Sequence, residues 1–127
     1  TSVRNDTMPR IRHTTLACSP GCTVEATLEL FGGKWKALIL YHLFEDGVLR
    51  FGELRRRLPN VTQRMLTNQL RELEADGLVS RTVFPEVPPH VEYALTELGK
   101  TLKPVIQALK AWGDRYAHSV QRNKDGD

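Results

Sequence analysis

The sequence lacks any apolar run long enough to span a membrane, and its first residues do not resemble a secretory signal. We therefore expect a cytoplasmic protein with no membrane association. No internal repeat and no second domain is recognisable in the 127 residues, which leave room for a single domain with a modest core. Domains of this size often gain stability by dimerising.

Catalytic motifs are also missing. The chain shows no Ser/His/Asp set, no paired-carboxylate site and no phosphate-binding loop. The GGKW segment at residues 32–35 contains glycine and lysine but lacks the surrounding residues of such a loop. We therefore predict that the protein is not an enzyme and uses no cofactor.

Cysteine is limited to Cys18 and Cys22. A structural disulfide is not expected in a cytoplasmic chain, so the two thiols form a sensor, bind a metal or are inert. Their spacing is not a strong zinc signature, and even with His13 a fourth ligand is not evident, so we predict no metal. Cys22 lies just before a predicted helix, where the helix dipole favours the thiolate. The thiolate is the form that reacts with electrophiles and oxidants.

What the chain does contain is a helix-turn-helix pattern in its middle. Leu54 and Leu58 lie four residues apart and give a short helix one apolar stripe, which Pro59 ends. Thr62 is placed to cap a second helix, and Gly77 to stop it. The apolar stripe of this second helix consists of Met65, Leu66, Leu70 and Leu73. Two helices joined by so tight a turn match the motif whose second helix enters the major groove of DNA.

The outward face of the second helix carries side chains that can contact bases or phosphates. Arg55, Arg56 and Arg57 on the preceding helix can contact the DNA backbone. Between Arg50 and Arg81, seven basic residues stand against four acidic ones, and the resulting charge of +3 favours double-stranded DNA as a partner. The alternative is the solvated face of an ordinary α+β domain. The candidate recognition residues are Thr62, Gln63, Arg64, Thr67, Asn68 and Arg71.

A β-hairpin is predicted directly after the two helices. Residues 80–84 and 91–95 are rich in strand-forming residues, and the PEVPPH segment between them is stiffened by three prolines. Arg81 and His90 flank this tip, which would suit a wing lying on the minor groove or the DNA backbone. A hairpin that only closes a small sheet is the alternative.

Two helices and a short strand are predicted before this motif. Thr23 can cap the first helix, whose apolar positions are Val24, Leu28 and Phe31. Gly32 and Gly33 separate it from a second helix with an apolar face formed by Trp35, Leu38, Ile39, His42 and Leu43. Leu49 and Phe51 indicate a short strand.

The last predicted helix starts after Thr96, its N-cap, and is expected to bend at Pro104. Its apolar residues recur at steps of four and three, the pattern of a helix that pairs with another helix. We favour a homodimer interface, assisted by Leu28, over packing on the same domain. The interface residues of this helix are Leu98, Leu102, Val105, Leu109, Trp112 and Tyr116.

Several of these segments together resemble the HxlR-type winged helix-turn-helix regulators, over about residues 22–112. The resemblance implies a dimeric bacterial or archaeal DNA-binding regulator, often responsive to electrophiles or oxidants through a cysteine near its N-terminus. This chain departs from the family in having Thr23 where proline is usual, and in its extra Cys18. The matching pieces are Cys22 with Val24 and Glu25, GGKW at 32–35, LRFGEL at 49–54, ML and QLRELEADGLV within 65–79, and PEVPPHVEYALTELG at 85–99.

The predicted fold is thus α+β and mainly helical, a winged helix-turn-helix with added N- and C-terminal dimerisation helices. We expect a flexible arm at residues 1–17, the domain with its dimerisation helix at 18–118, and a disordered tail at 119–127. The first functional hypothesis is a homodimer that binds a palindromic operator and senses oxidants or electrophiles through Cys22 and Cys18. A regulator with a non-covalent small-molecule effector and incidental cysteines is the second. The third is a protein-interaction module that does not bind DNA.

Overall fold

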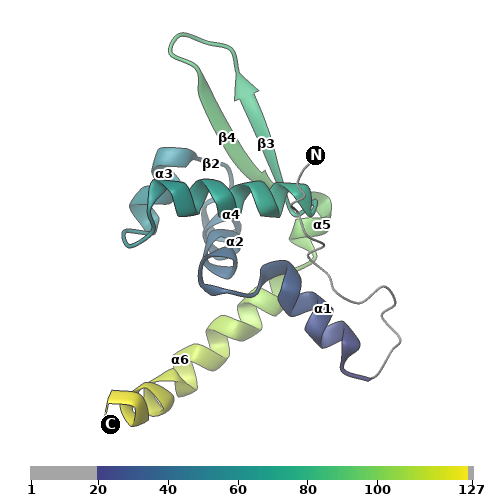
Figure 1. Cartoon of the computed structure of the whole chain (residues 1–127), viewed down its shortest axis with the longest axis vertical. Coiled ribbons are helices and arrows are strands. Elements are labelled where there is room, and N and C mark those ends of the chain that lie inside the picture. Colours follow the sequence, from purple (N-terminus) through teal and green to yellow (C-terminus); the bar gives the residue numbers. More distant parts are fainter. Residues whose placement is uncertain (1–19, 126–127) are drawn as a thin grey trace.

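The computed structural model describes residues 20–125, and side chains as far as residue 120. It confirms a mainly helical α+β fold in which a helix-turn-helix is followed by a β-hairpin (Figure 1). The hairpin projects at one end of the molecule, and the last helix extends toward the other end. The elements in chain order are α1 (Cys22–Phe31), α2 (Lys34–Asp46), β2 (Leu49–Arg50), α3 (Phe51–Arg57), α4 (Gln63–Ala75), β3 (Val79–Phe84), β4 (His90–Leu95), α5 (Glu97–Lys100) and α6 (Lys103–Asp125).

A three-stranded antiparallel sheet has the order β2-β4-β3. In its central strand Tyr93 lies between Leu49 of β2 and Arg81 of β3. The hairpin strands each begin one residue earlier than predicted. The predicted strand around residue 50 is shorter than expected, because Phe51 starts α3 instead of continuing β2.

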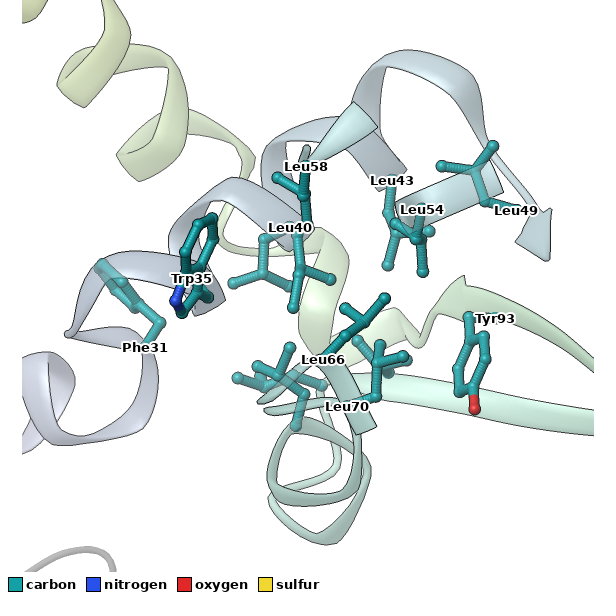
Figure 2. Close-up of a cluster of buried hydrophobic side chains, with 14 of the residues drawn as sticks. Phe31, Trp35, Leu40, Leu43, Leu49, Leu54, Leu58, Leu66, Leu70 and Tyr93 are labelled. Atoms are coloured by element: carbon teal, nitrogen blue, oxygen red, sulfur yellow. The ribbon is translucent and has the colours of Figure 1, made fainter. Parts of the chain in front are cut away.

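The hydrophobic core lies where α2, α3 and α4 meet the base of the sheet (Figure 2). Each helix contributes side chains with no more than 2% of their surface exposed, and burying one such leucine or isoleucine is worth about 1.5–3 kcal/mol. Trp35 and Phe31 extend the cluster toward α1, and Ile106 attaches α6 to it. The most deeply buried helical side chains are Ile39, Leu40, Leu43, Leu54, Leu66, Leu70 and Leu73.

The local signals of the helix-turn-helix are confirmed. Helix α3 ends at its C-cap Leu58, before Pro59. The Thr62 side chain caps α4 by accepting a hydrogen bond of 3.0 Å from the backbone N–H of Met65. Gly77 follows the end of α4 with a φ of 80°, a left-handed conformation that glycine adopts without strain. These caps fix the angle at which α4 leaves the turn.

The predicted helix faces need correction at several positions. The N-cap of α1 is Gly21 rather than Thr23. In α2 the buried face includes Leu40, whereas Leu38 is 38% exposed and His42 is half-buried. Burial lowers the pKa of His42, which favours its neutral form. Met65 is 41% exposed, so it does not belong to the buried stripe of α4.

The predicted last helix is divided in two. Thr96 is its N-cap as expected, but α5 ends at Lys100 and α6 begins at Lys103. Pro104 therefore lies in the first turn of α6, where a missing N–H costs no helical hydrogen bond, and not inside a continuous helix. Helix α6 continues to Asp125, so the tail predicted to be disordered from residue 119 begins inside a helix.

Two predictions about the first residues, the arm at 1–17 and the position of Cys18, lie outside the described residues. Across the part that the structure does describe, no helix combines the length and the apolar character needed to cross a bilayer.

Candidate nucleic-acid interface

The first turns of α4 present a polar, exposed face. The side chains of Gln63, Arg64, Asn68 and Arg71 are all exposed. Arg64, Asn68 and Arg71 follow one another at steps of four and three, which places them on one side of the helix. This side lies away from the buried leucines, so guanidinium and amide groups are free to meet base edges or phosphates.

The two threonines of the candidate site are already engaged in the helix. Thr62 uses its side-chain oxygen as the cap acceptor. The Thr67 hydroxyl donates to the backbone carbonyl of Gln63 at 2.8 Å. Each can still offer its methyl group to DNA, and in addition Thr62 its hydroxyl proton and Thr67 its hydroxyl oxygen as an acceptor.

The three arginines of α3 divide into two groups. Arg55 and Arg56 are exposed beside the turn. The Nε of Arg57 instead lies 2.8 Å from Oδ2 of Asp46, and its terminal nitrogen donates to the carbonyl of Glu53 at 2.9 Å. Arg57 therefore links α3 to the end of α2, and its expected contact with the DNA backbone stays a prediction beside this structural role.

The wing contains one exposed cation near its base and a histidine that is held within the hairpin. Arg81 is exposed on β3. The ring of His90 stacks on Phe84 with centroids 4.6 Å apart, and its two nitrogens each lie 3.2 Å from a carboxylate, of Glu86 and of Glu92. Only 15% of the His90 side chain is exposed. Its proposed contact with DNA stays a prediction, and the geometry shows a packing role beside it.

Lys36 of α2 is a buried charged residue that was not among the predicted site residues, and it contacts α4. Its side chain is 5% exposed, and Nζ lies 2.5 Å from Oε1 of Glu72 on α4. The signal was present, because Lys36 lies three residues before Ile39 and four before Leu40, on the side of α2 that the core occupies. Lysine is rarely buried, so this spacing alone is a weak signal.

Cys22 is the first residue of α1. Its side chain is 2% exposed and is disulfide-bonded in this structure. Among the residues described, no group of three or more His, Cys, Asp or Glu side chains could hold a metal ion. Cys22 is thus in an oxidised state in this structure.

Most of the predicted dimer-interface side chains are exposed. On α6, Leu109 is 50% and Trp112 56% exposed, and the Trp112 and Tyr116 rings lie 5.4 Å apart. On α1, Leu28 is 56% exposed. Leu102 differs, because it packs against the core of its own domain. The exposed apolar face of α6, which we call the α6 face, consists of Val105, Leu109, Trp112, Tyr116 and Val120.

An open groove of about 400 Å³ lies between α2 and α6. Its walls are mainly apolar, with one ion pair at the edge in which Lys110 donates to Asp114 at 2.8 Å. This hydrogen bond raises the pKa of Lys110. The lining residues are Ala37, Leu38, Tyr41, Ile106, Leu109, Lys110 and Asp114.

Comparisons with known proteins agree with this arrangement. The family profile described as HxlR-like helix-turn-helix matches residues 30–121. The "Uncharacterized HTH-type transcriptional regulator YdeP" of Bacillus subtilis is 56% identical over 102 residues, which cover 80% of this chain and 79% of that protein.

Two solved structures extend the similarity. The redox regulator HypR in its reduced form is 53% identical with a TM-score of 0.74, covering 79% of this chain and 98% of that one. The reduced form of the transcriptional regulator YodB from B. subtilis is 40% identical with a TM-score of 0.65, covering 74% of this chain and 91% of that one. The chain belongs to the HxlR-like helix-turn-helix family of DNA-binding transcriptional regulators.

Proposed function

We propose that this regulator acts as a homodimer on a palindromic operator and responds to oxidants or electrophiles through Cys22. The observation that most supports DNA binding is the exposed polar face of α4, from Gln63 to Arg71. The opposite side of the helix is packed on the core through buried leucines. A symmetric dimer would place two such helices about 34 Å apart, in successive major grooves.

The DNA-binding part is tested by two arginine variants with different expected effects. Arg64→Ala should cost on the order of 1–3 kcal/mol at a selected operator, because a bidentate contact to a base is lost. Arg56→Ala should instead weaken binding to all sequences and reduce the salt dependence by about one unit of slope. Fluorescence anisotropy with operator and scrambled duplexes at several salt concentrations measures both quantities. Unchanged affinity on replacing Gln63, Arg64, Asn68 and Arg71 together would exclude α4 as the recognition helix.

The assembly part depends on apolar surface that one subunit leaves exposed. The side chains of the α6 face, and that of Leu28 on α1, are each about half exposed. Contiguous exposed apolar patches on small proteins mark interaction sites. In a homodimer the α6 face of one subunit would pack against the α6 face of the other. A twofold axis would then relate the two recognition helices.

The sensing part depends on the position of Cys22 at the start of α1. HypR is described as a redox regulator, and it resembles this chain over most of the domain. The disulfide at Cys22 supports this proposal, because it would be the oxidised state of such a switch. With diamide, two thiols would lose their hydrogens and form one S–S bond, and the azo group would be reduced to a hydrazine. The second thiol would be Cys18 of either subunit or a small thiol.

Oxidation would act on DNA binding through α1. If α1 packs on the dimer helices, a crosslink or adduct at its first residue changes how the subunits meet. A shift of about an ångström or two between recognition helices matters, because the pitch of DNA fixes the half-sites. Diamide or a quinone should therefore weaken operator binding.

Single cysteine variants test this switch. Cys22→Ser should bind the operator normally and ignore the oxidant, whereas Cys18→Ser, the matched control, should respond in part. Gel shifts before and after diamide, and after reduction, give the readout. Loss of the operator by oxidised Cys22→Ser would remove Cys22 from the sensor role.

The groove between α2 and α6 favours a second candidate function, a regulator with a non-covalent effector. Its volume and apolar lining would suit a small aromatic molecule. In that case the double variant Cys18→Ser, Cys22→Ser would still release its operator when the effector is added. Retention of the operator under every small molecule that releases it from the wild type would exclude this alternative.

A further inference from the structure

Lys36 of α2 is the buried charged side chain of the core. Of the residues whose side chains the structure describes, it is the one charged residue with less than a tenth of its surface exposed. Moving an ammonium group out of water is costly even after the protein relaxes. The carboxylate of Glu72, 41% exposed, offsets this cost at an Nζ–Oε1 distance of 2.5 Å.

Apolar side chains are buried on both sides of the contact between α2 and α4. Buried residues on the α4 side are Leu66, Leu70 and Leu73, and on the α2 side they include Ile39 and Leu43. Packing between leucine side chains is strong but has little directional preference. It therefore fixes the distance between two helices more tightly than it fixes the rotation of each helix about its own axis. The Lys36–Glu72 ion pair adds a directional contact at this interface.

Rotation of α4 is what base recognition depends on. Glu72 directly follows Arg71 and lies one turn after Asn68, so the ion pair holds the same segment that carries the recognition side chains. Side-chain tips lie roughly 5–6 Å from a helix axis, so a rotation of about 10° moves them by about 1 Å. Bidentate hydrogen bonds to a base do not tolerate such a shift well.

We propose that Lys36 is a positioning residue for DNA recognition, which fixes the rotation of α4 through Glu72. This inference rests on the proposed role of α4 in base recognition. A buried ion pair is a weak source of stability but can select one arrangement among several with similar packing. Lys36 would therefore affect the choice between duplex sequences more than the stability of the fold.

The experiment begins with wild-type protein and a randomised duplex library, from which an operator is selected. The measured quantity is the ratio of dissociation constants for a scrambled duplex and the operator. In Lys36→Met, which keeps the length of the side chain without its charge, this ratio should fall about tenfold, equivalent to about 1.4 kcal/mol. Affinity for the scrambled duplex should stay within about twofold, because the phosphate contacts remain.

Two further variants separate positioning from packing. Lys36→Met combined with Glu72→Met replaces the pair by apolar side chains, and should recover thermal stability without recovering the ratio. Lys100→Met removes the lysine of an exposed ion pair with Glu97 on α5, and should leave the ratio unchanged. Recovery of the wild-type ratio by the double variant would reduce Lys36 to a packing residue.

The remaining outcomes also decide the matter. A folded Lys36→Met with the wild-type ratio overturns the inference. If Lys36→Met does not fold, Glu72→Gln carries the test, with an expected fall of about threefold; an unchanged ratio then overturns it. If the wild type itself selects no duplex, the proposed base recognition by α4 fails, whereas normal selection with unaffected variants removes only the role of Lys36.

Discussion

Gly99 illustrates at the level of single residues how closely α5 packs against the start of the wing. A Cβ at this position would lie 2.1 Å from the carbonyl oxygen of Leu78. This oxygen belongs to the backbone, so no side-chain rotamer change could relieve the clash. The neighbouring Thr96 ties the same region together, since its hydroxyl donates to the carbonyl of Gly77 and its oxygen accepts from the N–H of Gly99. The absence of a side chain at Gly99 is therefore what lets α5 approach the chain after α4.

Gly99→Ala should lower the free energy of unfolding by about 1–3 kcal/mol, or more if α5 is displaced. Urea denaturation followed by circular dichroism measures this change. Gly52→Ala is the matched control, because a Cβ there meets only the end of the Arg56 side chain at 3.9 Å. Since Gly52 lies within α3, alanine should raise stability there by up to about 1 kcal/mol. Equal effects of both variants would contradict the packing described for Gly99.

Single-residue signals in the sequence were reliable where the chemistry is local. The cap at Thr62 and the stop at Gly77 depend on residues within one turn, so the sequence alone predicts them. The spacing of Lys36 to Ile39 and Leu40 indicates its burial, but its pairing with Glu72 could not be predicted, because Glu72 lies on another helix and only the packed structure brings the two together. Met65 was misassigned for a related reason, since helical spacing does not show how wide the buried stripe is.

At the level of elements, the wing combines a histidine held by packing with an arginine that is left exposed. The His90 ring is held by Phe84 and two carboxylates, and Arg81 is left exposed. Arg81→Ala should weaken binding to every duplex and reduce the salt slope by about one, as loss of one phosphate contact does. Anisotropy titrations at increasing salt measure this. His90→Ala is the comparison, and a larger loss of affinity there than at Arg81 would make His90 the main DNA contact of the wing.

The predicted elements are correct in type and order apart from small shifts at their ends, and the largest error is the last helix, which the structure divides into α5 and α6. The apolar stripe continues from Leu98 to Leu102 at a step of four, across the break between α5 and α6. Periodicity alone therefore cannot show the break. Pro104 was the signal, since proline is best tolerated in a first helical turn. The structure has the start of a new helix there and not the predicted bend within one helix.

At the level of the whole molecule, the apolar surface divides into a core and an unpartnered face. Ile106 of α6 reaches the core with 4% exposure, whereas Leu109, Trp112 and Tyr116 of the same helix are about half exposed. One helix thus contributes to its own domain near its start and presents the α6 face beyond it. Sequence periodicity predicted the apolar stripe of the last helix. Only the structure shows that Leu102 packs against the core of its own domain, whereas the other members of the stripe on α6 are exposed.

The double variant Leu109→Asp, Trp112→Asp should convert the proposed dimer to monomers. Each large apolar side chain is worth about 1.5–3 kcal/mol when buried, and both subunits lose two, so the dissociation constant should rise by several orders of magnitude. Light scattering at micromolar concentration measures the mass, and circular dichroism checks that the domain is folded. Val48→Asp is the control, because Val48 is 54% exposed but lies between α2 and β2. If the double variant stays dimeric, the subunits meet through another surface, and the spacing of the two recognition helices is set there.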